Sequence, residues 1–212
     1  MLKLAQGSSR PIIITLGIVI IVFILSNIYP HNILNIIRWP VLYIFFIIVW
    51  FFRDPERKIP SGKNNILSPA DGRVVKITNQ KGRTKIAIFM SLFNVHVNRI
   101  PIRGKIISKK HIQGKYQPAF KPNIHMTNEQ SEILIQNQSI EVKVTQIAGL
   151  LARKIINNLV PDTEVIAGQR YGMIRFGSRV DIEFPLICKV QCRKGQKVKA
   201  GETILAKIVK DA

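Results

Sequence analysis

Two long apolar stretches begin the chain. Residues 11–29 carry no charge and are long enough to cross the hydrocarbon core of a membrane as a helix. Residues 33–52 are also mostly apolar but are interrupted by Arg38 and Pro40, and the part that follows Pro40 is short for a spanning helix by itself. A turn between the two stretches would let them fold back on each other as a helical hairpin.

Basic side chains lie at the outer end of both stretches. Lys3 and Arg10 precede the first stretch, and Arg53, Arg57 and Lys58 follow the second. Because basic residues concentrate on the cytoplasmic side of membrane segments, this pattern predicts an N-terminal transmembrane helical hairpin with both ends in the cytoplasm. One spanning or re-entrant segment followed by an interfacial helix is the alternative.

After residue 58 the pattern changes to that of β-structure. Apolar residues alternate with polar ones, or form short unbroken runs, over the length of strands. The clearest runs are residues 66–77, 85–91, 105–108 and 140–147. The sequence therefore predicts a membrane anchor of two apolar helices at residues 1–58 and one mainly β domain at residues 59–212.

Two turn-forming strings indicate which β-fold to expect. SPADGRV (residues 68–74) and KGQKVKAGETIL (residues 194–205) resemble the turn patterns of barrel-sandwich hybrid domains, which include lipoyl and biotinyl carriers. Those carriers place a lysine between two methionines at the centre of a hairpin, and neither string has that arrangement. We therefore expect a barrel-sandwich-hybrid-like β-sandwich without a carrier function.

A Gly-Ser pair, Gly177-Ser178, is the first candidate for chemistry. The apolar positions around it are Met173, Ile174 and Phe176 before the pair and Val180, Ile182 and Phe184 after it. This pattern predicts strand, tight glycine turn, strand. The serine hydroxyl can attack the preceding carbonyl if a base takes its proton, and elimination of the resulting ester would cut the chain. Most Gly-Ser pairs are nevertheless plain turns.

The wider sequence resembles one enzyme family. RYGMIRFGSRVD (residues 170–181), with SPADGRV upstream and FMSLFNVHVNRIP (residues 89–101) between them, resembles the short, type A-like phosphatidylserine decarboxylase proenzymes from about residue 51 to the C-terminus. These are self-processing, pyruvoyl-dependent lyases. The resemblance implies cleavage between Gly177 and Ser178 and a heterodimer of the fragments 1–177 and 178–212, with further oligomerisation left open.

The same resemblance implies the reaction. Ser178 would become a covalent pyruvoyl cofactor that forms a Schiff base with the amine of phosphatidylserine. Loss of carbon dioxide would then give phosphatidylethanolamine, a step of phospholipid biosynthesis. Gly177 would supply the carbonyl of the scissile bond.

Two further residues acquire roles from the resemblance. Asp71 would be an orienting carboxylate, and His96 would be the base for self-cleavage or the proton-transfer group in decarboxylation. From the residues alone, Asp71 reads as a turn former and His96 as a structural histidine. Longer bacterial members carry two histidines three residues apart here, and Arg99 replaces the second. The base is therefore His96 or another residue.

Three arginines are candidates to hold the phosphate or carboxylate of the substrate. These are Arg99, Arg175 and Arg179, of which the last two flank the Gly-Ser pair. The alternative for Arg175 and Arg179 is a pair of exposed side chains. The apolar tip at residues 116–120 resembles the family's loop near the substrate, and docking onto lipid is its alternative.

The charge of the chain favours an anionic partner. Lys and Arg outnumber Asp and Glu by 32 to 12, which gives a net charge of +20. Such a surplus suits nucleic acid or an anionic membrane surface, and a basic bias of the whole proteome is the alternative source. The soluble part has no nucleic-acid-binding motif, so the apolar N-terminus makes the membrane surface the expected partner.

The spacing of the cysteines and histidines shows whether a disulfide or a metal site is expected. Cys188 and Cys192 lie on one face of a predicted strand, where small apolar core residues are expected rather than a disulfide. Four scattered histidines without HxH or HExxH spacing predict no metal site. A reducing compartment suits these thiols, so we expect the catalytic domain on the cytoplasmic face of the cell membrane.

Two other functions remain open at this point. A membrane-anchored, non-enzymatic β-sandwich adaptor would account for the anchor and the strands, and it predicts one intact polypeptide. A decarboxylase acting on a related serine lipid would use the same headgroup chemistry.

Overall fold

The computed structural model describes residues 3–29, 32–115, 127–149, 155–175 and 177–209. The tip at residues 116–120 lies outside them. The chain divides into two units, Met1–Pro55 and Glu56–Ala212, each with its own internal contacts.

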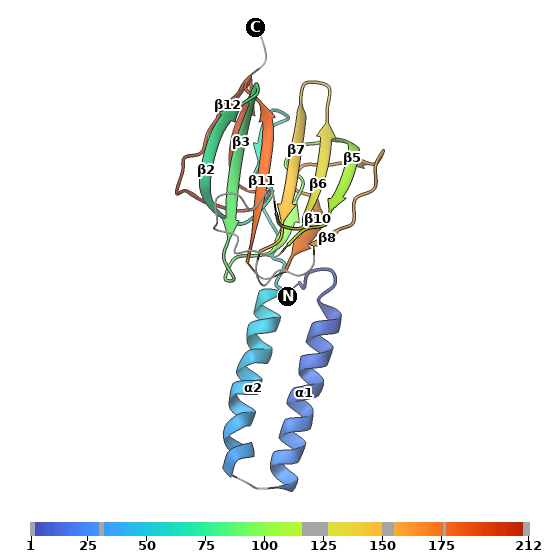
Figure 1. The fold of residues 1–212 in the computed structure, drawn as a ribbon, viewed down its shortest axis with the longest axis vertical. Helices are drawn as coiled ribbons and strands as arrows, with labels where there is room; N and C mark the ends of the chain where they lie inside the picture. The colour runs from blue at the N-terminus through green and yellow to red at the C-terminus, as the bar shows by residue number, and fades with distance from the viewer. Residues whose placement is uncertain (1–2, 30–31, 116–126, 150–154, 176, 210–212) are drawn as a thin grey trace. The chain divides into compact units, whose positions relative to one another are not determined.

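The first unit is a hairpin of two helices, α1 (Ser9–Ile28) and α2 (Asn32–Phe51), shown in blue in Figure 1. Both helices are long and apolar enough to cross a membrane, by length and composition. Most of their large apolar side chains are exposed, as in Ile13 and Ile33, which suits a surround of lipid rather than water. The predicted helical hairpin is confirmed.

Helix α2 continues through the two residues that interrupt its apolar stretch. Pro40 lies inside the helix, where it removes one backbone hydrogen bond but leaves the element continuous. The Arg38 guanidinium lies 5.9 Å from the ring centroid of Phe23 and 5.2 Å from that of Trp39. Cation–π contacts of this kind offset part of the cost of placing a charge in an apolar helix.

The second unit is mainly β, as predicted, and its largest sheet curls around the core (Figure 1). The order in this eight-stranded sheet is β13 (Lys197–Val198), β2 (Gly72–Gln80), β3 (Arg83–Met90), β11 (Ser178–Pro185), β7 (Glu141–Ile147), β6 (Gln130–Gln136), β5 (Gly104–Ile112) and β9 (Glu164–Val165). Two three-stranded sheets complete the unit. Their orders are β1 (Asn65–Leu67), β14 (Ile204–Ile208), β12 (Cys188–Val190) and β4 (Val97–Arg99), β10 (Arg170–Ile174), β8 (Ile155–Asn157).

The two predicted turn strings lie side by side. Strand β13 pairs with the start of β2, with Val198 opposite Gly72. The backbone amide of Gly201 donates to the carbonyl of Ser68, and the amide of Ser68 donates to the carbonyl of Thr203, both at 2.8 Å. The two turns therefore brace each other across the sequence.

The two cysteines lie at and beyond strand β12. Cys188 is buried and Cys192 is half-buried, and both thiols are free. Burial raises the pKa of each thiol, so neither is an activated thiolate at neutral pH.

Candidate active site

The Gly-Ser pair lies where the chain passes from one sheet to another. Strand β10, which ends at Ile174, belongs to the sheet with β4 and β8, whereas β11 begins at Ser178 in the large sheet. The strands on both sides of the pair are therefore present as predicted, but they do not pair with each other as a hairpin. The Gly177–Ser178 bond therefore lies where β11 begins, after the chain has left the sheet of β10.

Gly177 adopts a backbone conformation that favours glycine. Its φ is +62°, in the left-handed region, where a Cβ costs about 1–2 kcal/mol. A Cβ added at this position would meet no atom within 4 Å. Glycine is therefore required by the turn rather than by lack of space.

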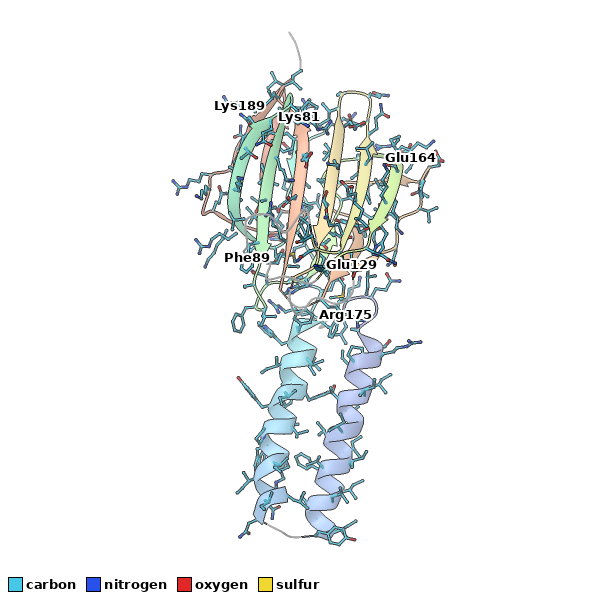
Figure 2. The ribbon with its side chains drawn as sticks, viewed as in Figure 1. Lys81, Phe89, Glu129, Glu164, Arg175 and Lys189 are labelled. Atoms are coloured by element: carbon cyan, nitrogen blue, oxygen red, sulfur yellow. The ribbon has the colours of Figure 1, made fainter. Side chains whose placement is uncertain are left out.

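The second motif of the family lies directly alongside. Met90 at the end of β3 is opposite Ser178, and Val97 in β4 is opposite Met173 in β10. The segment that joins β3 to β4 therefore begins and ends beside the two strands that flank the Gly-Ser pair. Figure 2 shows Phe89 and Arg175, which border these two segments, at the same end of the sheet domain.

Ser178 points into the core. Side chains alternate between the two faces of a strand, so Ser178 shares the inner face of β11 with Val180 and Ile182. It is fully buried, and its Oγ donates to Met90 Sδ at 3.4 Å. A thioether is a weak acceptor, so the hydroxyl is located without being strongly held.

His96 is fully buried next to the Gly-Ser segment. The backbone amide of Ile174 donates to the carbonyl of His96 at 3.4 Å, which places the histidine beside the end of β10. His96 Nδ1 lies 2.9 Å from the carbonyl oxygen of Asn94. Because a carbonyl only accepts, Nδ1 must carry the proton, and in the neutral ring Nε2 then bears the lone pair that a base needs.

Asp71 is held between two structural partners. Its Oδ2 accepts a hydrogen bond from Arg57 at 2.7 Å, and its Oδ1 accepts one from the backbone amide of Ala200 at 2.8 Å. The carboxylate therefore ties the turn after β1 to the turn after β13. Its orienting role toward a base stays a prediction.

The three candidate arginines differ in their surroundings. Arg179 lies on the outer face of β11 and forms a bidentate ion pair with Asp181 at 2.6 and 2.9 Å. Arg99 is buried and donates to the carbonyl of Gly168 at 2.9 Å. Arg175 is half-buried. The alternative of an exposed pair is wrong for Arg179, and Arg175 is the most accessible candidate for contact with substrate.

Two buried amides were missed by the motif analysis. Asn98 and Gln146 are fully buried, and Gln146 Nε2 donates to Asn98 Oδ1 at 2.8 Å. Asn98 Nδ2 in turn lies 3.9 Å from Met90 Sδ, the same atom that accepts from Ser178. Alternation along β7 could have revealed Gln146, because it interrupts an inner face otherwise formed by Val142 and Val144.

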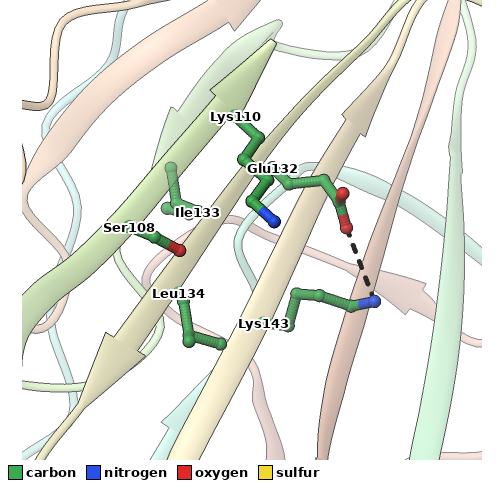
Figure 3. Close-up of a pocket in the computed structure, with 6 residues that line it drawn as sticks. All are labelled: Ser108, Lys110, Glu132, Ile133, Leu134 and Lys143. Carbon is green, nitrogen blue, oxygen red and sulfur yellow. Dashed lines mark ion pairs between the residues drawn. The ribbon is translucent and has the colours of Figure 1, made fainter. Parts of the chain in front are cut away.

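A shallow pocket of about 250 Å³ lies elsewhere on the sheet (Figure 3). It is lined by Ser108 and Lys110 of β5, Glu132, Ile133 and Leu134 of β6, and Lys143 of β7. Lys143 and Glu132 form an ion pair across it at 3.4 Å. None of the sequence-predicted site residues lines this pocket.

Metal chemistry has no visible centre in the described ranges. Within them, no group of three or more His, Cys, Asp or Glu side chains could hold a metal ion.

Comparison with known proteins identifies the class of enzyme. The family model "Phosphatidylserine decarboxylase" matches residues 44–206. This range covers every strand from β1 to β13 and the beginning of β14. The chain is therefore a decarboxylase, a carboxy-lyase. It belongs to the phosphatidylserine decarboxylase family.

Individual relatives cover most of the chain. It is 42% identical over 178 residues to a phosphatidylserine decarboxylase proenzyme of Chlorobium chlorochromatii, covering 81% of this chain and 84% of that protein. It is also 42% identical over 207 residues to a protein of Methanosarcina barkeri assigned the name archaetidylserine decarboxylase proenzyme, covering 98% of this chain and 100% of that protein.

Proposed function

We propose that this chain cleaves itself between Gly177 and Ser178 and then converts phosphatidylserine to phosphatidylethanolamine and carbon dioxide. The observation that carries the proposal is a fully buried serine hydroxyl that follows a left-handed glycine at the crossing between two sheets. The relatives named as proenzymes support a processing step.

The cleavage chemistry balances with the groups of this chain and one water. Ser178 Oγ bonds to the Gly177 carbonyl carbon, the C–N bond breaks, and the hydroxyl proton passes through a base to the freed nitrogen. Loss of the Ser178 Hα and of the Cβ–Oγ bond then releases Gly177 as a carboxylate and leaves dehydroalanine. Tautomerisation, addition of water and loss of ammonia convert that terminus into a pyruvoyl group.

His96 is the base that the geometry supports best. The carbonyl of Asn94 holds its Nδ1–H, so that the proton-accepting nitrogen is Nε2. It lies beside the end of β10, next to the segment that we propose is cut. Asp71 would be the orienting carboxylate, and its hydrogen bonds from Arg57 and from the amide of Ala200 would fix its position.

The surroundings of Ser178 fit a pyruvoyl group. The inner face of β11 is apolar apart from the serine, and Met90 Sδ can contact a methyl group as well as a hydroxyl. When present, the group supplies a ketone that condenses with the headgroup amine and accepts the electrons left by carbon dioxide. Arg175 is our candidate to hold the anionic part of the substrate, with Arg99 and Arg179 retained as weaker candidates.

The two helices suit a lipid substrate. Because a diacyl lipid stays in the bilayer, the enzyme that modifies its headgroup must work at the membrane surface. Helices α1 and α2 would anchor the chain in the cell membrane with the catalytic domain on the cytoplasmic face, and the net charge of +20 would attract anionic phosphatidylserine.

A second substrate has a specific observation in its favour. The Methanosarcina barkeri relative, which aligns with nearly the whole of this chain, bears the name of an archaetidylserine decarboxylase proenzyme. Archaetidylserine presents the same serine headgroup on a different lipid backbone.

Mass spectrometry under denaturing conditions tests the processing step. We expect two chains, residues 1–177 and residues 178–212, the smaller with a blocked N-terminus that gains a trapped adduct on borohydride reduction with serine lipid. Carbon dioxide release from vesicles of phosphatidylserine, compared with vesicles of archaetidylserine, then identifies the substrate. A single intact chain would instead support the adaptor.

A further inference from the structure

A continuous set of buried polar contacts links strand β7 to the hydroxyl of Ser178. Gln146 donates to Asn98 at 2.8 Å. Asn98 Nδ2 donates to the carbonyl of Pro69 at 3.4 Å and contacts Met90 Sδ at 3.9 Å. Met90 Sδ accepts from Ser178 Oγ at 3.4 Å. Gln146, Asn98, Met90 and Ser178 are each 0% exposed, so the set is closed to solvent.

Gln146 shares the inner face with Ser178. It lies opposite Val180 in the β7–β11 pairing, which makes it the diagonal neighbour of Ser178 on the same face. Its Oε1 has no hydrogen-bond partner within the part of the chain that the structure describes. Burying an amide with an unmade hydrogen bond is unfavourable, so packing alone does not account for glutamine at this position.

We propose that Gln146 and Asn98 are positioning residues for self-cleavage, an inference that rests on the function proposed above. Gln146 fixes the Asn98 side chain, and Asn98 fixes the Met90 thioether through its Nδ2. The thioether then holds Ser178 Oγ at one place, while the left-handed turn presents the Gly177 carbonyl. The pair thus orders the attacking group without touching the bond that breaks.

A thioether is suited to both states of the site. Before cleavage it accepts weakly from the hydroxyl, so the proton remains available to a base. During cleavage Oγ departs with Gly177, and the former serine Cβ becomes a methyl group. A carboxylate or carbonyl at the place of Met90 Sδ would then be left without its donor, whereas a sulfur atom packs against a methyl group.

Three variants of the full chain test the proposal. Gln146→Met removes the amide at similar length, and Asn98→Asp keeps the acceptor for Gln146 but removes the donor to Met90. Thr145→Val is the matched control, since Thr145 directly precedes Gln146 in β7, is also buried and faces the other side of the sheet. Each chain is pulse-labelled in cell-free synthesis with lipid nanodiscs, and the conversion of precursor to fragments is followed with time.

We expect Gln146→Met and Asn98→Asp to slow conversion about 10- to 100-fold, because small misplacements of a reacting group have effects of that size. Thr145→Val should remain within about twofold of the unsubstituted chain. Hydroxylamine cleaves esters, and it should release no fragment rapidly from the folded Gln146→Met precursor because the attack itself is slow. Rapid release would show that the ester forms normally and would overturn the positioning role.

The outcomes separate this inference from the proposed function. If the unsubstituted chain is never cut at residue 177, the proposed function fails. If it is cut and Gln146→Met is cut equally fast, only the positioning role fails. Equal slowing in Thr145→Val would indicate general loosening and also overturns the role. The thermal unfolding midpoint shows whether Gln146→Met folds. If it does not fold, the processing rate of Asn98→Asp decides whether the positioning role stands.

Discussion

The two faces of strand β11 are both largely buried, yet the polar groups of one face have charged partners and the polar group of the other does not. The inner face carries Val180, Ile182 and Phe184 together with Ser178, whose hydroxyl contacts only a weak acceptor among the bonds described. The outer face carries Arg179, Asp181 and Glu183, each of which is tied to an opposite charge.

The charges of the outer face form a ladder across four strands. Lys85 of β3 contacts Asp181 at 3.1 Å and Glu183 at 3.2 Å, and Lys143 of β7 contacts Glu183 at 3.2 Å and Glu132 of β6 at 3.4 Å. Such pairing satisfies these charged groups, so they serve the stability of the sheet and not a reaction. The comparison teaches that one strand can hold paired charges on one face and carry, on the other, the hydroxyl that we propose as the attacking group.

Removing the serine should have the largest effect and would break the comparison on the inner face. Ser178→Ala deletes the attacking oxygen, so we expect no cleavage and a chain that keeps its full mass of 24.1 kDa. The inner face loses only a weak contact, so the thermal unfolding midpoint should change little. Fragments appearing at the normal rate would refute the assignment of this bond.

Unpairing the outer face should damage stability and leave the chemistry intact. Asp181→Leu leaves Arg179 buried without its bidentate partner, and we expect a loss of about 3–5 kcal/mol in the free energy of unfolding, measured with urea. The double variant Arg179→Met/Asp181→Leu should recover much of this loss. At a temperature where Asp181→Leu is folded, cleavage should proceed at the normal rate. If cleavage is blocked in the folded variant, the outer face also takes part in the reaction and the comparison fails.

The glycine that precedes β11 sharpens the comparison. Gly177→Ala should cost about 1–2 kcal/mol through its left-handed φ and should also slow cleavage, because relief of the strain moves the carbonyl. Gly82→Ala in the β2–β3 turn is the control, with a φ of +73° and equally open space. Both variants should lose similar stability, and only Gly177→Ala should process slowly. Equal cleavage rates in the two variants would show that Gly177 serves only the turn and not the cleavage.

The smallest expected effect is a pH dependence from the outer face. Burial tends to raise the pKa of Glu183, but Lys143 and Lys85 outweigh burial and lower it below its usual 4.5. A lowered carboxyl pKa stabilises the fold above about pH 4.5, and this contribution is lost as the pH falls through the lower folded value. We expect a share of about 0.5 kcal/mol, because solvent screens part of the network.

Thermal unfolding from pH 7 to pH 3 measures this contribution. Glu183→Gln should have a shallower acid branch than the unsubstituted chain, whereas Glu164→Gln at an exposed site should not. Identical acid branches in all three chains would show that Glu183 does not contribute to stability through the charge ladder.

Much of the fold could be predicted from residue patterns. Long, mostly apolar stretches predicted the two helices. Period-two alternation predicted the strands on both sides of Gly177 and Ser178, because this periodicity follows from local backbone geometry. Arg38 and Pro40 interrupt the second apolar stretch but not helix α2, since a helix can lose one backbone hydrogen bond and continue.

Partners across the sequence could not be predicted in the same way. Arg179 belongs to the charge ladder because β3 and β7 pair on either side of β11. Asp71 binds Arg57 and Ala200 because two distant turns meet. Asn98 and Gln146 are 48 residues apart and share a hydrogen bond only because the fold brings these side chains of β4 and β7 together in the core.

The sequence by itself determined the apolar helical hairpin, the β-rich domain, the family and the Gly-Ser bond as the candidate for cleavage, because each depends on local periodicity or on a contiguous motif. Only the tertiary structure decided that the bond lies where the chain passes from one sheet to another, that the serine faces the core and that Arg179 beside it faces away. Those facts depend on which strands pair, and strand pairing is fixed by contacts between residues far apart in the chain.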